Sequence, residues 1–154
     1  MRIFASIDEL AAAVGETLGP GPWYPVDQRR VDLFADATDD HQWIHVDPAR
    51  AATGPYGGTI AHGYLTLSLL PALVGRLYKV SGVAMGVNYG LNRVRFPAPV
   101  RVGSAVRAAA TIAEVSRIEG GAQMVATVTV ESDAGGKPVC VAETVSRLYG
   151  GGPV

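Results

Sequence analysis

One stretch of the sequence is so uniformly apolar that it dictates how the rest of the chain must fold. It reads GYLTLSLLPALVGRLY and spans Gly63 to Tyr78. A helix that is apolar around most of its circumference needs burial on nearly all sides. Pro71 lies inside the stretch and is expected to kink the helix, because proline lacks a backbone N–H and its ring crowds the preceding turn. The remaining elements must therefore cover this helix.

Four segments after Gly82 are suited to form that cover. They are rich in β-branched residues, and apolar and polar positions alternate most clearly in MVATVTVE and VCVAETVSRL. Short runs of turn-forming residues separate them, so successive strands are expected to pair antiparallel. The expected strands are Val83 to Phe96, Ser104 to Ile118, Gln123 to Glu131 and Pro138 to Tyr149. The pattern predicts an α+β fold with an antiparallel sheet wrapped around the apolar helix.

The first part of the chain is expected to be mainly helical. Ser6 followed by Glu9 has the spacing of a capping box and predicts a helix from Ser6 to Val14. A short strand is expected near Trp23 to Val26, and Asp27 is placed to cap a second helix over Gln28 to Thr38. No long linker interrupts the 154 residues, so one domain spanning 1–154 is expected. An open sheet edge would remain, and pairing with a second copy would cover it, so we expect a homodimer.

Composition excludes several classes of partner. The net charge of −1 provides no broad basic surface for nucleic acid. No run approaches the roughly 18 apolar residues of a membrane span, and no signal peptide is visible. The lone cysteine, Cys140, sits in an alternating segment typical of a buried strand and cannot form an internal disulfide. These features favour a cytoplasmic protein with Cys140 in its core.

Titratable residues are concentrated in TDDHQWIHVDP, residues 38–48, which we interpret as a polar loop from Asp39 to Asp47. Two histidines four residues apart, His41 and His45, could share a metal on a helix, but no third ligand stands at a recognisable spacing, so a metal is the least favoured interpretation. Asp47 directly precedes Pro48 and is placed to cap a helix over Pro48 to Ala52.

A third interpretation of the same segment is a general acid–base pair formed by Asp40 and His45. A carboxylate and an imidazole can hold one water between them and exchange its protons with a substrate. From the residues alone, the metal, capping and acid–base interpretations all remain open for this segment.

The segment FADATDDHQWIHVDPARA resembles the signature of the MaoC-like (R)-specific enoyl-CoA hydratases and 3-hydroxyacyl-thioester dehydratases. GGTIAHGYLTLSLLPAL is similar to the stretch leading into that family's central helix, and YGLNRVRFPAPVRVG is similar to its Phe-Pro-x-Pro-Val-x-x-Gly element. There is also some similarity to nodulation protein N. The three elements occur in order between Phe34 and Gly103. The resemblance implies a hot-dog fold, a helix wrapped by an antiparallel sheet that usually dimerises.

The resemblance also implies a reaction and a catalytic pair. Water adds reversibly to the 2,3-double bond of an acyl thioester, either acyl-CoA or an acyl carrier protein thioester, with Asp40 and His45 as catalytic residues and with no cofactor. Charge grows on the thioester oxygen, and a backbone N–H at a helix N-terminus can stabilise it. Gly63 stands at that place. The simpler interpretation of Gly63 is tight helix packing.

Other residues are expected to contact substrate or shape the site. The family usually has Asn-Pro where this chain has Gln42-Trp43; Gln42 keeps an amide, whereas Trp43 adds bulk. His62 is expected to line the site or to orient the loop, and Tyr64 to border the acyl pocket. The phosphates of coenzyme A favour nearby arginines, so we add to these candidates Arg93 and Arg95.

Two other functions compete with the hydratase. Hot-dog folds also serve acyl-CoA thioesterases, although the Asp-x-x-x-x-His spacing before a His-Gly helix entry fits the hydratase pattern better. A non-catalytic acyl-binding domain is the other alternative, and it would be favoured by loss of the catalytic residues. Asp40 and His45 are both present, so the sequence predicts an enzyme, a hydro-lyase.

Overall fold

The apolar stretch at the centre of the molecule forms two short helices. The computed structural model describes residues 1–150, and the last four residues of the expected 1–154 domain lie outside the described residues. Helix α5 (Gly63–Ser68) is followed by α6 (Leu70–Val74), with Leu69 at the junction. Pro71 has no N–H to donate to the preceding turn, which explains why the helix is interrupted there. The prediction of one helix reaching Tyr78 was wrong, because Tyr78 begins strand β4 (Tyr78–Val80).

The four predicted long strands are confirmed, with ends that lie within two residues of those expected. They are β5 (Val83–Arg95), β6 (Ala105–Ile118), β7 (Gly121–Ser132) and β8 (Cys140–Gly150). All pair antiparallel, in the order β6-β7-β8-β5. Strands β2 (Thr17–Leu18) and β3 (Tyr24–Pro25) add to the free side of β6. Strand β5 therefore forms the opposite edge of the sheet.

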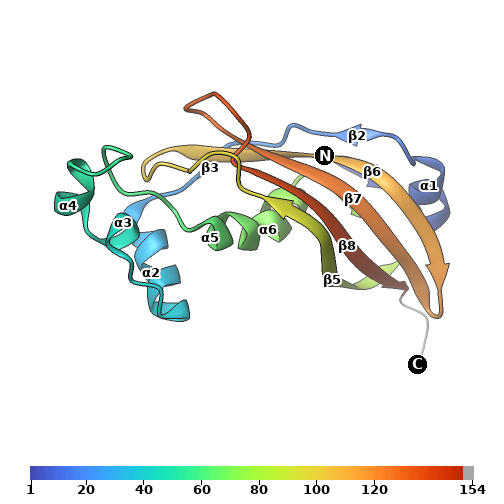
Figure 1. Ribbon diagram of the computed structural model, residues 1–154. Helices are drawn as coiled ribbons and strands as arrows, with labels where there is room; N and C mark the ends of the chain where they lie inside the picture. The colour runs from blue at the N-terminus through green and yellow to red at the C-terminus, as the bar shows by residue number, and fades with distance from the viewer. Residues whose placement is uncertain (151–154) are drawn as a thin grey trace.

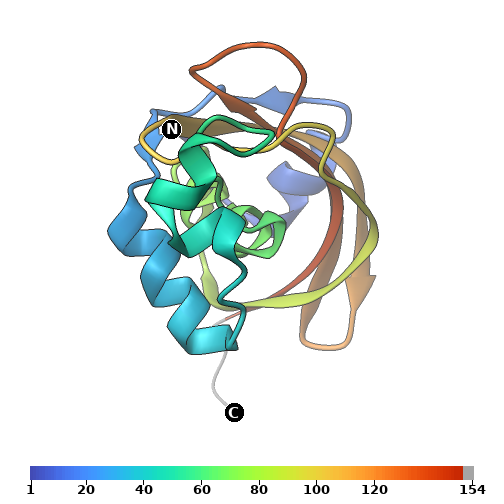
Figure 2. The same ribbon diagram turned by 60° about the vertical axis from the view of Figure 1, so that its left-hand side comes forward.

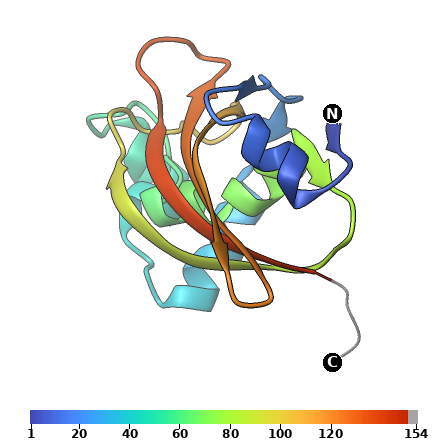
Figure 3. The same cartoon turned by 90° about the vertical axis from the view of Figure 1, so that its right-hand side faces the viewer.

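The sheet curves around α5 and α6, as Figures 2 and 3 show. Alternate residues of β7 turn inward and are buried, as the alternating sequence predicts. Leu65 of α5 and Leu70 and Leu73 of α6 belong to the same core cluster, which also includes Cys140, fully buried as expected. Burial raises the pKa of the Cys140 thiol to about 11. This is the hot-dog arrangement that the family resemblance implies.

The capping predictions in the first part of the chain are confirmed. The Glu9 N–H donates to Ser6 Oγ at 3.1 Å and starts α1 (Ile7–Ala12). The Arg30 N–H donates to Asp27 Oδ1 at 2.9 Å and starts α2 (Gln28–Thr38). A parallel pair, β1 (Arg2–Phe4) with β4, was not expected, because the sequence analysis placed Tyr78 in a helix.

Helices α2, α3 (Trp43–Val46) and α4 (Pro48–Ala52) project together beyond the end of the sheet (Figure 1). The expected loop over Asp39 to Asp47 was therefore partly wrong, since it contains the single turn α3. Asp47 Oδ1 accepts from the Arg50 N–H at 3.0 Å, so the predicted cap of α4 is confirmed. Within residues 1–150, no helix is both long and apolar enough to cross a bilayer.

Candidate active site

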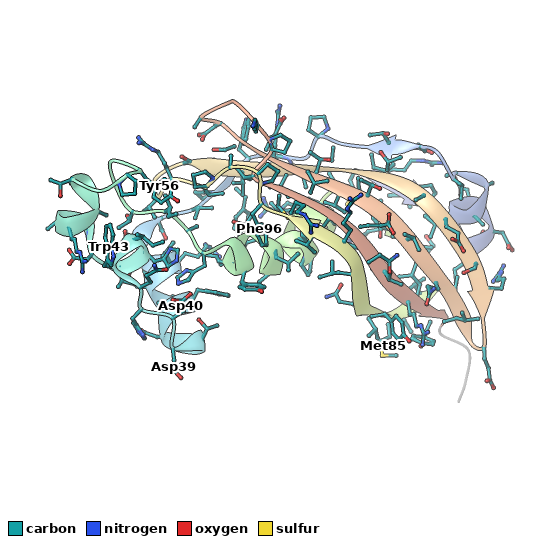
Figure 4. All side chains as sticks on the ribbon, viewed as in Figure 1. Asp39, Asp40, Trp43, Tyr56, Met85 and Phe96 are labelled. Atoms are coloured by element: carbon teal, nitrogen blue, oxygen red, sulfur yellow. The ribbon has the colours of Figure 1, made fainter. Side chains whose placement is uncertain are left out.

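The polar segment between α2 and α3 reverses the chain direction beside the start of α5. Asp39 ends α2 in the left-handed conformation, with φ of 59°. This turn directs the side chains of Asp39 and Asp40 to different sides, as Figure 4 shows. His41 is exposed and pairs with Asp36 Oδ1 at 2.8 Å, which raises its pKa. His41 therefore lies outside the site.

His45 is buried, with 6% of its surface exposed. Its Nδ1 lies 2.7 Å from the main-chain oxygen of Ile60, and because a carbonyl only accepts, Nδ1 carries the proton. In the neutral ring Nε2 is then free to accept a proton. Burial lowers the pKa of His45; the Ile60 hydrogen bond opposes this shift, neighbouring His62 adds to it, and Asp40 opposes it. The ring is suited to act as a neutral base.

His62 lies directly against His45. The two rings stack with centroids 3.8 Å apart and planes 25° from parallel. His62 Nε2 donates to the main-chain oxygen of Asp40 at 2.9 Å, and only 2% of the residue is exposed. Its Nδ1 is buried without a hydrogen-bond partner among the described residues. His62 is the side chain that contacts both Asp40 and His45.

One side-chain atom from each of Asp40, His45 and His62 lies within 4.8 Å of the others. Within residues 1–150 these form the only such group of three potential metal ligands. Two of the four ring nitrogens already donate to carbonyl oxygens, and a third, His62 Nδ1, is buried. The Asp40 carboxylate is half exposed, so water reaches it. The group is better arranged to hold a water than to hold a metal.

A cavity of about 380 Å³ opens beside His45. The start of α5 and the segment after β5 form much of its wall. The lining includes His45, Tyr56, Gly63, Thr66 and Phe96. A side chain at Gly63 would meet Phe96, since an added Cβ would lie 2.9 Å from its ring. The Gly63 N–H, at the first position of α5, has no acceptor among the described residues. A substrate oxygen in the cavity can use this donor.

Other predicted contacts lie outside this cavity lining. Trp43 packs on Arg50, whose guanidinium carbon is 4.5 Å from the ring centroid, and against Gly54, where a Cβ would meet the ring at 2.9 Å. Gln42 is exposed, and its main-chain oxygen accepts from the His45 N–H at 2.9 Å. Tyr64 is 71% exposed on α5. His62 is shielded behind His45 and also does not line the cavity.

The two predicted phosphate-binding arginines are not brought to the cavity either. Arg93 pairs in register with Glu143 and Arg95 with Val141, whereas the intervening Ala142 of β8 is buried under the sheet. Because strand residues alternate between faces, both arginines lie on the outer face. With Glu143, Val141 and Thr127 they line a separate hollow of about 360 Å³.

Sequence reasoning missed the residues that hold the main chain at His45 by hydrogen bonds. Gln28 Nε2 donates to the main-chain oxygen of His45 at 2.7 Å, and Thr59 Oγ1 donates to Gln28 Oε1 at 2.6 Å. Ile60, next to Thr59, donates its N–H to the Ile44 oxygen at 3.0 Å. Gln28 was seen only as the start of a helix, and no local signal links it to a residue 17 positions away. Tyr56 and Phe96 were missed as lining residues, although aromatic side chains beside glycine and proline were a usable signal.

Three comparisons place these observations among known proteins. The chain is 55% identical over 148 residues to 3-hydroxyacyl-thioester dehydratase Z of Mycobacterium tuberculosis, covering 96% of this chain and 98% of that protein. It is 46% identical over 147 residues to nodulation protein N of Rhizobium leguminosarum bv. viciae, covering 93% and 91%. The solved structure of the (R)-hydratase from A. caviae involved in PHA biosynthesis superposes with a TM-score of 0.68 at 27% identity, covering 88% and 96%.

The family model of the MaoC like domain matches residues 9–134, which include the three clustered side chains and all of the cavity lining except Val139. Its match extends from α1 through most of the sheet, so it covers far more than the polar segment. Together with the relatives that align over nearly the whole chain, it confirms the resemblance found in the sequence. The chain belongs to the MaoC-like dehydratase family.

Proposed function

We propose that this protein is an (R)-specific 2-enoyl-CoA hydratase, or in the reverse direction a 3-hydroxyacyl-thioester dehydratase. The observation that carries the proposal is the buried His45 ring, which lines the cavity with Nδ1 engaged by Ile60, while the Asp40 carboxylate lies in the same cluster just outside the lining. A separation within 4.8 Å suits one bridging water, because each of its hydrogen bonds spans about 2.8 Å.

In the proposed reaction, the water oxygen bonds to C3 of the enoyl thioester. The proton that water loses passes to His45 Nε2, and the electron pair of the double bond moves towards the thioester oxygen. C2 then takes one proton from the Asp40–His45 pair, so the pair ends as it began. The Asp40 carboxylate orients the water and stabilises the transient imidazolium.

The enolate oxygen that forms in this step requires a hydrogen-bond donor. The Gly63 N–H is a candidate, because it borders the same cavity as His45 and is otherwise unpaired among the described residues. A donor that is already in place when charge develops stabilises the transition state more than the ground state. We assign Gly63 this role in addition to its close packing against Phe96.

The proposed substrate class is supported by the relatives of the chain. The relatives named above include a 3-hydroxyacyl-thioester dehydratase and an (R)-hydratase, which supports an acyl thioester carried by coenzyme A or by an acyl carrier protein. No step of the proposed reaction needs a cofactor. A cytoplasmic setting is supported by the lone, buried Cys140.

We also propose that the protein is a homodimer joined through β5. This strand forms a sheet edge, and nearly all of its length is exposed. It displays the apolar side chains of Met85, Val87, Tyr89 and Leu91. A long, exposed and apolar sheet edge favours pairing with another strand, and a second copy of β5 offers a matching one.

Loss of the 2-enoyl absorbance of crotonyl-CoA, followed by chiral analysis of the 3-hydroxy product, tests the reaction. Asp40→Asn and His45→Gln should each lower kcat by about 10²–10⁴-fold. His41→Gln is the matched control and should leave kcat unchanged, because His41 pairs only with Asp36 outside the site. Release of free thiol without hydration would support the thioesterase instead. Binding of acyl-CoA with neither reaction would support a non-catalytic domain.

A further inference from the structure

We propose that His62 is a positioning residue that holds Asp40 and His45 in register with each other. This inference rests on the proposed function and decides between the two roles expected for His62, lining the site or orienting the loop. Its supporting observation is geometric: a single buried ring hydrogen-bonds to the main chain at one member of the pair and stacks on the other.

The two members of the pair lie in different local structures. Asp40 lies between α2 and α3, whereas His45 lies within the four-residue turn α3. The Asp40 side chain has one weak local contact, from the Gln42 N–H at 3.5 Å. The His62 Nε2–H, at 2.9 Å from the Asp40 carbonyl, is a stronger restraint on the segment that carries this carboxylate.

His62 is itself held firmly. Phe34 of α2 lies against its ring, with centroids 5.0 Å apart, and His45 covers another side at 3.8 Å. Its main-chain oxygen accepts from the Thr66 N–H at 3.2 Å, which joins it to the first turn of α5. His62 also directly precedes Gly63, so one residue connects the acid–base pair to the proposed oxyanion donor.

The unpaired Nδ1 of His62 is consistent with a ring that is held as a single tautomer, with its proton on Nε2. The Asp40 carbonyl requires a proton on Nε2, and Nδ1 has no partner within residues 1–150. His45 has the opposite arrangement, with its proton on Nδ1 towards Ile60. The stacked rings are thus expected to be two different tautomers of histidine, each fixed by a main-chain carbonyl.

A histidine-selective ¹H–¹⁵N spectrum of the intact protein tests this arrangement without any substrate. The chain has three histidines, so the ring signals can be assigned by single substitutions. We expect His62 as the Nε2–H tautomer and His45 as the Nδ1–H tautomer. A His62 ring protonated on Nδ1 would overturn the inference, even if hydration were observed.

Two substitutions separate the contacts of His62. His62→Phe keeps a ring for stacking and removes the donor, whereas His62→Gln keeps an amide donor at similar reach and removes the ring. Each should lower kcat by about tenfold to 100-fold, because small misplacements of catalytic groups have effects of this order. KM should stay within about twofold, since His62 does not line the cavity.

The outcomes distinguish this inference from the proposed function. Unchanged kcat in both variants, or a raised KM at unchanged kcat, would overturn the positioning role while leaving the hydratase intact. If the wild-type protein hydrates no enoyl-CoA, the proposed function fails. The ¹H–¹⁵N ring signal of His45 still tests whether His62 contacts His45. That signal should shift in His62→Gln, which removes the stacked ring, and stay unchanged in the control His41→Gln.

Discussion

The Nδ1 atom of His45 lies 2.7 Å from the main-chain oxygen of Ile60, and this contact fixes which ring nitrogen is available for chemistry. Burial lowers the pKa of the ring, so His45 should stay neutral at pH values where an ordinary histidine is already charged. In a pH profile of kcat/KM for crotonyl-CoA, the midpoint of the decline on the acidic side should therefore lie below about pH 6.5. A midpoint above that value, in a decline that disappears in His45→Gln, would contradict the lowered pKa of His45.

The same shift predicts how stability depends on pH. In the unfolded chain His45 takes up a proton near pH 6.5, whereas in the folded protein it does so only at lower pH. The free energy of unfolding should therefore decline as pH falls below about 7, and less so in His45→Gln. His41, whose pKa is raised, has the opposite effect, so His41→Gln should steepen the decline. Urea unfolding between pH 5 and 7.5 measures both.

Gly63 and Phe96 should show a coupled effect on activity. A Cβ at residue 63 would lie 2.9 Å from the Phe96 ring, so Gly63→Ala should displace either the ring or the start of α5. We expect kcat to fall by about tenfold or more, because the N–H would move relative to the thioester oxygen. Phe96→Leu alone should have a smaller effect, and adding it to Gly63→Ala should restore part of the activity. Strict additivity of the two effects would contradict direct contact.

Some elements could be predicted from the sequence and others could not. The strands were predictable to within two residues, because alternation and turn residues are local signals. The break at Leu69 was not, since Pro71 was expected only to bend the helix. The Asp40–His45 pair came from the family signature. The stacking of His62 on His45 could not be predicted, because it joins residues 17 apart through a fold that must already be in place.

Gln28 should stabilise the protein through its hydrogen bonds to the His45 carbonyl and the Thr59 hydroxyl. Its amide links the His45 carbonyl, Asp32 and Thr59, so Gln28→Leu would leave the buried Thr59 hydroxyl and the His45 carbonyl without these partners. An unsatisfied buried polar group costs about 1–3 kcal/mol, and we expect the free energy of unfolding to fall by this order. Thr59→Val, which removes only one of these bonds, should cost less. If urea unfolding shows the same loss of unfolding free energy for Gln28→Leu and Thr59→Val, the Gln28–Thr59 hydrogen bond alone accounts for the effect.

The exposed edge strand gives a prediction about assembly. Val87 and Leu91 lie on β5 with 38% and 44% of their surfaces exposed, and pairing of two β5 strands would bring such side chains against a second copy. Val87→Lys and Leu91→Lys should each shift the protein towards monomer, because they place charge in an apolar interface. Leu33→Lys is the matched control: Leu33 is 59% exposed but lies on α2, away from this edge. Sedimentation velocity should show a monomer for the β5 variants at concentrations where Leu33→Lys and wild type are dimers. A wild-type monomer, or a dimer unaffected by both substitutions, would exclude β5 as the interface.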